Sequence, residues 1–276
     1  MKILITGVSG RIGHALLGYF EGLENSQLYF VVRERKESLS QYEQIIWDLN
    51  EKSDFDFSAL YFDRVIHMAA IAHHSGAKSV LEVNQAMTTN LLNAVKGKFD
   101  QFVFFSSISV YGEANRKYPV EVNDACDPTS FYGISKLKSE LFLKQHIENL
   151  LILRLCPMID GEGRIDLEKR IFLPKTKTKF KSPYPRSYSF STIDSIWRSL
   201  NDYSFKAQKR GVFNLSDGKI YSEQELLKMS SGEKMVSLPK VLIAPLFVIT
   251  GLFRSLSTVK NIENTLWKLF KVNTYS

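Results

Sequence analysis

The segment KILITGVSGRIG, residues 2–13, joins a short apolar run to three glycines at three-residue spacing. The run has the composition of a buried strand, and residues 11–21 have helical spacing. Gly7, Gly10 and Gly13 let the chain turn tightly and let a phosphate approach the main chain without meeting a Cβ. The free N–H groups at the start of the helix attract that phosphate. The segment therefore predicts a dinucleotide-binding strand–turn–helix.

Strands and helices continue to alternate through the first two-thirds of the chain. The expected strands are Lys2–Thr6, Leu28–Val32, Gln44–Trp47, Arg64–Met68, Gln101–Ser106 and Leu150–Leu155. The expected helices are Arg11–Glu21, Val80–Lys96 and Ser130 to about His146. This βαβ pattern predicts an α/β fold with a Rossmann-type, doubly wound parallel sheet. We expect an NAD(P)-binding domain over residues 1–160 and a smaller C-terminal substrate-binding lobe over 161–276, with one or more segments returning to the main sheet.

The regular alternation of strands and helices ends after Pro157. Residues 160–190 are rich in Lys, Pro, Ser and Tyr and show no long apolar period. A strand at Gly211–Ser216 is then expected to precede a serine-capped helix at Ser222–Met229. A last helix is expected from about Val259 to Phe270.

The apolar segment at residues 241–253 is too short for a transmembrane span, which needs about 20 residues. It is expected to form a buried helix. The alternative is an element on a membrane surface, flanked by Lys240 and Arg254. The start of the chain does not have the pattern of a signal peptide.

The composition is that of a globular protein, with 44% hydrophobic residues, two cysteines and a net charge of +7. Cys126 and Cys156 have neither a metal-binding nor a redox spacing, which favours a reducing, cytoplasmic setting. Part of the positive charge lies between Arg164 and Arg186, as a solvated face or as an attraction for a phosphorylated substrate or an acidic lipid surface. No binding module for nucleic acid accompanies it, so no nucleic acid partner is expected.

The residues after the second expected strand indicate which dinucleotide is bound. NAD enzymes carry an acidic residue here for the ribose hydroxyls, whereas this chain has Arg33 within VVRERK. A guanidinium pairs well with a 2′-phosphate, and Arg11 lies in the glycine turn. NADP is therefore favoured over NAD. In the alternative, Glu34 or Glu37 grips the ribose and the arginines are solvated.

Tyr132 and Lys136 are four residues apart in YGISK, so a helix places them on one face. A nearby ammonium favours tyrosinate and brings the pKa of the tyrosine toward the range of an acid–base catalyst. The lysine can also bond the nicotinamide ribose. Ser107 ends the fifth expected strand, where open α/β sheets bind ligands, and is the expected catalytic hydroxyl that contacts the substrate. Ser109 is either a second substrate contact or a structural hydroxyl.

The chain resembles the NAD-dependent epimerase/dehydratase family, the extended short-chain dehydrogenases/reductases that act on nucleotide sugars. The matching segments are GVSGRIG, WDL, HMAA, VNQAMTTNLL, SSISVYG, DPTSFYGISKLKSE and RLCPMIDGEG, in the expected order. The resemblance implies that Asp48 and Leu49 flank the adenine and that Pro157 and Ile159 lie near the nicotinamide carboxamide. The remaining cofactor contacts that it implies are in the glycine turn and after the fourth strand: Gly7, Gly10, Arg11, Ile12, Gly13, Ala69, Ala70 and Asn84.

The resemblance also bears on the reaction. Dehydratases of the family carry an Asp-Glu pair after the catalytic Ser or Thr, whereas this chain has Ile108 and Ser109. A reductase or an epimerase is therefore expected, and the basic cofactor pocket favours a reductase. Arg186 is placed as the substrate's diphosphate ligand, although Asp160 stands where the family often has Tyr.

Three alternatives remain for the function and the partners. As an enzyme, the protein is expected to act on a nucleotide sugar, with a small ketone or aldehyde as the alternative substrate. In the other alternative it is a non-catalytic NADP sensor. A homodimer is expected by analogy alone. His67, His73 and His74 are not expected to bind a metal, because hydride transfer uses the chemistry of the cofactor.

Overall fold

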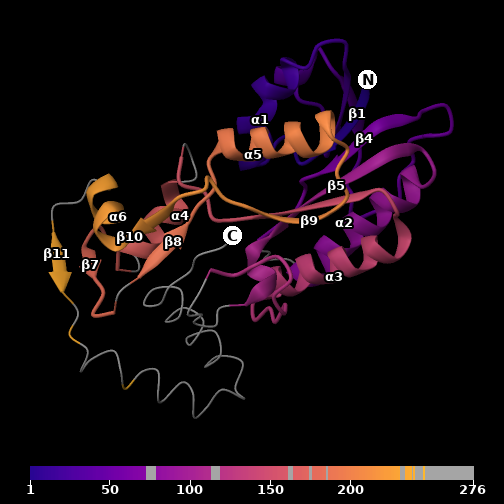
Figure 1. Ribbon diagram of the computed structural model, residues 1–276. Coiled ribbons are helices and arrows are strands. Elements are labelled where there is room, and N and C mark those ends of the chain that lie inside the picture. Colours follow the sequence, from indigo (N-terminus) through magenta and orange to yellow (C-terminus); the bar gives the residue numbers. More distant parts are fainter. Residues whose placement is uncertain are drawn as a thin grey trace. The chain divides into compact units, whose positions relative to one another are not determined.

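The structure, a computed structural model, describes residues 1–72, 79–112, 119–160, 164–173, 176–184, 186–230, 234–237, 239 and 245. Its main element is a seven-stranded sheet with the order β3-β2-β1-β4-β5-β6-β9 (Figure 1). These strands are β1 (Lys2–Thr6), β2 (Gln27–Val32), β3 (Glu43–Ile46), β4 (Phe62–His67), β5 (Phe99–Ser107), β6 (Leu150–Leu155) and β9 (Gly211–Leu215). The first six follow the strand order of the Rossmann fold, which confirms the predicted fold class.

The strands form where the sequence has near-continuous apolar runs, because both faces of this sheet are covered. Ile3, Leu4 and Ile5 of β1 are completely buried. The pairs from β3 through β5 are all parallel, and Ile3 aligns with Leu28 on one side and with Arg64 on the other. The strand order reverses between β1 and β4, which is where folds of this kind bind dinucleotides.

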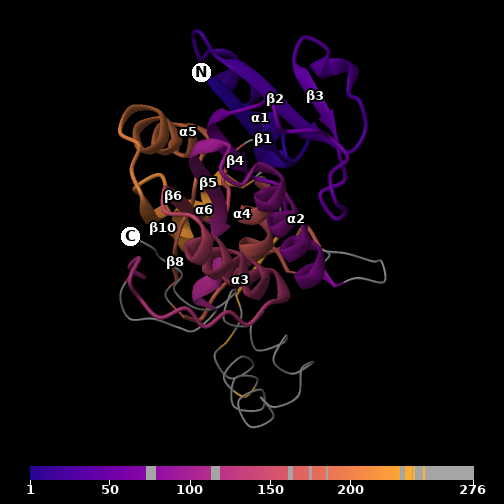
Figure 2. The ribbon, with the colours of Figure 1, turned by 90° about the vertical axis from the view of Figure 1, so that its right-hand side faces the viewer.

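Helices α2 (Val80–Val95) and α3 (Phe131–His146) lie side by side over one face of this sheet (Figure 2). Ser79 begins α2 with a capping box that also uses Glu82. On the other face, α1 (Arg11–Glu21) packs against the carboxyl-terminal half of α5 (Ile193–Leu200) (Figure 1), where Trp197 contacts the rings of Tyr19 and Phe20. The π-helix η4 (Asn201–Lys206) continues from α5. The short 3₁₀ helices are η1 (Glu37–Leu39) and η2 (Ile108–Tyr111).

Shorter elements make up most of the later chain. Two small sheets pair β8 (Ser187–Ser189) with β10 (Ile220–Ser222) and β7 (Lys179–Lys181) with β11 (Met235–Ser237). The helices are α4 (Arg164–Ile171) and α6 (Glu223–Met229), and they enclose a core that includes Leu167, Tyr188, Phe190 and Leu226. Ser222 caps α6, as its sequence predicts, and Glu225 completes a capping box there.

The chain divides into two compact units that alternate along the sequence. The first unit comprises Met1–Val110, Phe131–Arg154 and Trp197–Phe213. The second comprises Tyr111–Ser130, Leu155–Ile196 and Asn214–Ser276. Each unit therefore draws on three separate stretches of chain.

The expected elements of the first unit agree with the structure to within two residues at each end, and α1 agrees at both ends. The later helices α4 and α5 and the three-residue strands were missed, because α4 is polar and the strands are too short to show a period. The apolar segment 241–253, except Pro245, and the expected helix Val259–Phe270 lie outside the described residues. Among those that are described, no helix has the length and hydrophobicity to cross a membrane.

Candidate active site

The glycine turn joins β1 to α1 at the point where the strand order reverses. Gly7 has a φ of +81°, and a Cβ on it would lie 2.5 Å from the main-chain nitrogen of Ala69. A Cβ on Gly13 would lie 2.2 Å from the Gly7 carbonyl oxygen. Both positions therefore require glycine. Gly7 needs it because of its positive φ and its close approach to the chain after β4. Gly13 needs it because the start of α1 packs closely against the turn.

Helix α1 begins after Gly10, which has no side chain to cap the helix. Within the fully described stretch 1–72, Gly10 caps the helix without a side-chain bond, and the first turn carries no acidic residue. Arg11 is exposed and Ile12 is half-buried in that turn. An anion at this helix end would meet main-chain N–H groups and the positive end of the helix dipole. The turn thus fits the pyrophosphate of a dinucleotide.

The end of β2 carries the residues that were expected to select the cofactor. Arg33 and Arg35 directly follow the strand and are exposed. Glu34 pairs with Lys36, and this pairing lowers the pKa of Glu34. Of the two acidic alternatives for the ribose, Glu34 is therefore already bonded to a neighbouring cation, whereas the side chain of Arg33 is accessible.

Four further residues that were assigned to the cofactor lie after β3 and β4. The exposed carboxylate of Asp48 accepts hydrogen bonds from the Asn50 main chain at 3.0 Å and from its side chain at 3.1 Å. Leu49 is buried in the core of the sheet. Ala69 and Ala70 are half-buried, and the Ala69 N–H donates to Thr6 Oγ1 at 3.3 Å.

Asn84 lies on α2 and is buried. Its Oδ1 accepts from the Ile71 N–H, and its Nδ2 donates to the Ile71 carbonyl and to Ser135 Oγ, each at 2.9 Å. Ser135 in turn donates to the Tyr132 carbonyl at 2.8 Å. Asn84 therefore ties the chain after β4 to the first turns of α3, and its own contact with a cofactor stays a prediction.

Tyr132 and Lys136 lie on one face of α3, as their spacing predicts. The Lys136 amine is 5.9 Å from the centre of the Tyr132 ring and 4.7 Å from that of Phe104. It donates to the Phe105 carbonyl at 2.7 Å, which ties α3 to the carboxyl end of β5. Because Lys136 is buried, desolvation lowers its pKa to about 7, while the charge of Glu140 acts in the opposite direction.

Ser107 is the last residue of β5 and follows Phe105 by two positions. It is half-buried, and its hydroxyl donates to Ser109 Oγ at 3.1 Å while it accepts from the Ser109 N–H at 3.2 Å. Ser109 thus orients Ser107 in this structure. The three expected catalytic residues all belong to the end of β5 and the start of α3, within the first unit.

The sequence-based prediction missed a buried ion pair one helical turn beyond Lys136. Arg154 on β6 donates to the Glu140 carboxylate through Nε at 3.0 Å and through Nη2 at 2.6 Å. Ser106 donates to the same carboxylate at 2.5 Å. The spacing of Glu140 four residues after Lys136 was the available signal, but β6 could not be placed beside α3 from the sequence.

Pro157, Ile159 and Arg186 belong to the second unit. The side chain of Arg186 is fully buried, and its guanidinium pairs with Glu223 at 2.8 Å. It also donates to the carbonyls of Arg170 and Phe180, at 2.7 Å and 3.2 Å. These contacts favour a structural role over the expected contact with a substrate diphosphate, which stays a prediction. Pro157 is half-buried, and Ile159 is buried in the core of this unit.

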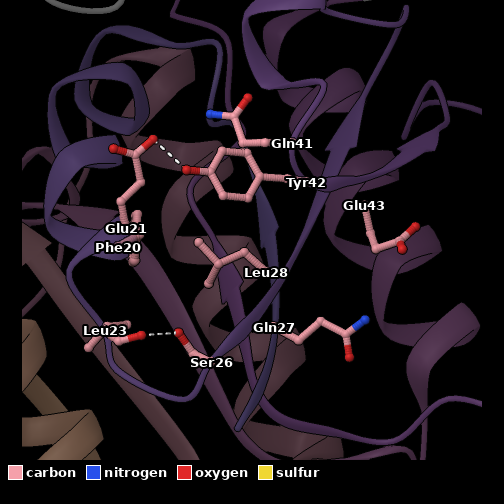
Figure 3. A pocket seen from close by; sticks show the side chains of 9 residues that line it. All are labelled: Phe20, Glu21, Leu23, Ser26, Gln27, Leu28, Gln41, Tyr42 and Glu43. Carbon is pink, nitrogen blue, oxygen red and sulfur yellow. Dashed lines mark hydrogen bonds between the residues drawn. The ribbon is translucent and has the colours of Figure 1, made fainter.

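A cavity of about 320 Å³ lies at the amino-terminal ends of strands β2 and β3 (Figure 3). Gln27 and Leu28 begin β2 and Glu43 begins β3, and all three line it. Tyr42 donates to Glu21 at 2.5 Å across this cavity. Because α/β sheets bind dinucleotides at the carboxyl ends of their strands, this cavity is not the expected cofactor site.

Histidines were not expected to bind a metal. His73 and His74 lie outside the described residues. His67 is buried, and its ring nitrogens lie 2.8 Å from Thr6 Oγ1 and 3.1 Å from Thr88 Oγ1. Among the described residues, no group of three or more His, Cys, Asp or Glu could hold a metal ion.

A model of the NAD dependent epimerase/dehydratase family matches residues 3–182. An uncharacterized epimerase/dehydratase of Staphylococcus saprophyticus is 30% identical over 252 residues, which cover 82% of this chain and 78% of the relative.

Two solved structures are also similar. The UDP-glucuronic acid 4-epimerase of Bacillus cereus, in complex with NAD, has a TM-score of 0.68 and 25% identity and covers 87% of this chain and 86% of its own. A short-chain dehydrogenase/reductase superfamily protein of Agrobacterium tumefaciens with bound NAD has a TM-score of 0.69 and 19% identity, covering 86% and 85%. The chain belongs to the NAD dependent epimerase/dehydratase family and is an enzyme of the extended short-chain dehydrogenase/reductase type.

Proposed function

We propose that this enzyme transfers a hydride and a proton at a hydroxyl-bearing or keto carbon of a nucleotide-activated sugar, as a reductase or an epimerase. The observation that carries the proposal is the junction of α3 with β5, where Lys136 contacts both the Phe105 carbonyl and the Tyr132 ring. This arrangement presents a phenol and an amine from the start of α3, next to the chain that leads to Ser107. A cytoplasmic location and a homodimer remain part of the proposal.

The residues have distinct roles in this proposal. A bound nicotinamide supplies the hydride chemistry. Tyr132 exchanges a proton with the substrate oxygen, Lys136 stabilises the tyrosinate and bonds the ribose, and Ser107 holds the reacting oxygen by a hydrogen bond. Ser107 would exchange its bond to Ser109 for one to the substrate, so Ser109 positions the hydroxyl until substrate arrives.

The glycine turn and the end of β2 hold the cofactor in this proposal. The pyrophosphate rests on the main chain of Gly7 and Gly10 and on the first turn of α1, at the positive end of the helix dipole. Arg33 bonds the 2′-phosphate of NADP, since it is exposed while Glu34 is paired with Lys36. NADP is therefore proposed over NAD, although the similar solved structures described above carry NAD. Asp48 lies at the adenine end of the same site.

The nature of the substrate is tested with a panel of UDP-, GDP- and dTDP-sugars and their 4-keto forms. Each is incubated with NADPH or NADH, and nicotinamide absorbance and the sugar products are followed. Consumption of NADPH with a keto sugar would show a reductase. Interconversion of two sugars without net change in the cofactor would show an epimerase. Absence of turnover with every sugar, together with turnover of a small ketone or aldehyde, would contradict the nucleotide-sugar proposal; absence of all turnover would favour an NADP sensor.

A further inference from the structure

Three titratable residues repeat at four-residue intervals along α3. Tyr132, Lys136 and Glu140 therefore share the face of the helix that meets β5. Lys136 is 3% exposed and Glu140 is completely buried. The series that begins with the catalytic candidates Tyr132 and Lys136 thus ends at Glu140, a buried charged residue that the proposed reaction does not itself use.

Glu140 is fixed from two neighbouring strands. Arg154 of β6 binds both of its carboxylate oxygens, and Ser106 of β5 donates to Oε1. Ser106 lies between Phe105 and Ser107 on β5. The carbonyl of Phe105 accepts a hydrogen bond from Lys136. Consecutive residues of β5 therefore hold the lysine, hold the carboxylate and present the candidate catalytic hydroxyl.

A buried ion pair is weak evidence for stability, because apolar residues of similar volume often stabilise a core equally well. The ion pair lies one helical turn from the buried Lys136, which suggests a role other than stability. Burial disfavours the charged form of Lys136, and the negative charge of Glu140 opposes this effect. Arg154 pairs with that carboxylate through two charge-assisted hydrogen bonds, one to each of its oxygens.

The other groups that face Lys136 do not provide this negative charge. Strand β5 contributes the Phe104 ring and the Phe105 carbonyl. Strand β4 contributes His67, whose pKa is lowered to about 3 by burial and by the charge of Lys136, so it is neutral at physiological pH. On α3 itself the neighbours are Tyr132 and Glu140. Glu140 is therefore the anionic partner of the lysine among the described residues.

We propose that Glu140 is a positioning residue, whose buried carboxylate, held by Arg154 and Ser106, keeps the Lys136 amine in its charged form beside Tyr132. The inference rests on the proposed function for the role of Tyr132 and Lys136. It adds that the acid–base pair extends to a third residue, which touches neither substrate nor cofactor. Tyr132 and Lys136 then titrate as a coupled pair, and Glu140 determines how much tyrosinate that pair contains at neutral pH.

The test uses the double variant Glu140→Gln/Arg154→Met, which removes both charges and leaves neither partner unpaired. Titration of Tyr132 is followed in the protein without cofactor, as the tyrosinate absorbance lost when Tyr132→Phe is added in the same background. We expect tyrosinate to appear about one pH unit higher than in the wild type, because an uncharged Lys136 no longer favours it. Activity at neutral pH should fall about tenfold and recover as the pH is raised, with the cofactor KM nearly unchanged.

The matched control is Arg186→Met/Glu223→Gln, which removes a buried ion pair of the same kind in the second unit. It should leave the titration of Tyr132 unchanged. Ser106→Ala, which removes one hydrogen bond from Glu140 and no charge, should give a smaller shift in the same direction.

Three results would overturn the inference: an unchanged Tyr132 titration in the double variant, an equal shift in the control, or failure of the double variant to fold while the control folds. The last result would assign the pair to stability alone. Because the titration needs no substrate, a shifted Tyr132 in a protein that turns over no sugar would refute the proposed function while supporting the role of Glu140.

Discussion

The ring of His67 lies 2.8 Å from the hydroxyl of Thr6, across the pair of strands between which the strand order reverses. Its other nitrogen lies 3.1 Å from Thr88 on α2, and Thr88 in turn lies 3.1 Å from Ser139 on α3. This chain of hydroxyls and a ring links β1, β4, α2 and α3. The imidazole therefore acts as a structural link beneath the glycine turn.

His67 should make the fold sensitive to acid. Its pKa is lowered to about 3 by burial, whereas an unfolded histidine titrates near about 6.5. As the pH falls below about 6.5, the unfolded state takes up a proton that the folded state does not, so stability is lost by about 1.4 kcal/mol per pH unit. His67→Gln should show a smaller fall in Tm than the wild type between about pH 7 and pH 5. Equal falls would contradict the assignment, and the exposed His14→Gln is the control.

Gly13→Ala should destabilise the enzyme because its Cβ would meet the Gly7 carbonyl at 2.2 Å. Displacing α1 to relieve this overlap should cost about 1–3 kcal/mol, measured by chemical unfolding. Gly18→Ala on the same helix is the matched control, since nothing lies within 4 Å of its added Cβ. This control should stabilise the helix by up to about 1 kcal/mol. Similar effects of the two substitutions would show that the turn is not tightly packed.

Arg33→Ala should weaken NADPH much more than NADH. Loss of charge-assisted hydrogen bonds to the 2′-phosphate predicts a Kd for NADPH that rises about 10- to 100-fold, with NADH within about twofold. Fluorescence titration of both cofactors measures this difference. Arg35→Ala, at the neighbouring exposed arginine, is the control. Equal losses for both cofactors would refute the 2′-phosphate role, and tighter binding of NADH by the wild type would refute the preference for NADP.

Tyr132→Phe should lower kcat at least about 100-fold, because the proton donor is removed. The Kd of the cofactor should change by less than about threefold, since the ring remains beside Lys136. Single-turnover absorbance and cofactor titration separate the two effects. Tyr61→Phe, at an exposed tyrosine on the surface, is the control. An active Tyr132→Phe enzyme would end the assignment.

Arg186→Met should act on stability. It leaves the Glu223 carboxylate without its buried partner, which should cost about 3–5 kcal/mol, and Glu223→Gln in the same protein should recover part of this loss. Tm measures the effect. A stable Arg186→Met enzyme with a raised KM for a nucleotide sugar would instead support the diphosphate contact.

The first unit could be predicted from the sequence because its elements are long and its apolar runs are continuous. Residues 2–13 alone specify the β1–turn–α1 unit, and the tight turn that the glycine spacing predicts is present, because a Cβ on Gly7 or Gly13 would overlap the main chain. Four-residue spacing likewise placed Tyr132 and Lys136 on one face of α3. These features depend on residues that are close in sequence, so they can be predicted from the spacing of residues along the chain.

The partners of buried charges could not be predicted, because they depend on pairings that are distant in sequence. Arg154 meets Glu140, which is 14 residues away, only because β6 lies next to β5. Arg186 meets Glu223 across 37 residues. In the basic stretch between Arg164 and Arg186, Lys179 donates to the carbonyls of Leu227 and Ser230, so this stretch is not simply a solvated face.

The alternation of the two units along the chain limits how segments can be exchanged between this enzyme and its relatives. A single crossover placed within residues 111–213 would combine segments from two relatives in each of the two units and so mix the packing of both. Exchange of the whole second unit would therefore require coordinated replacement of Tyr111–Ser130, Leu155–Ile196 and Asn214–Ser276. Chimaeras joined at one site would test the fold of this enzyme before they tested its chemistry.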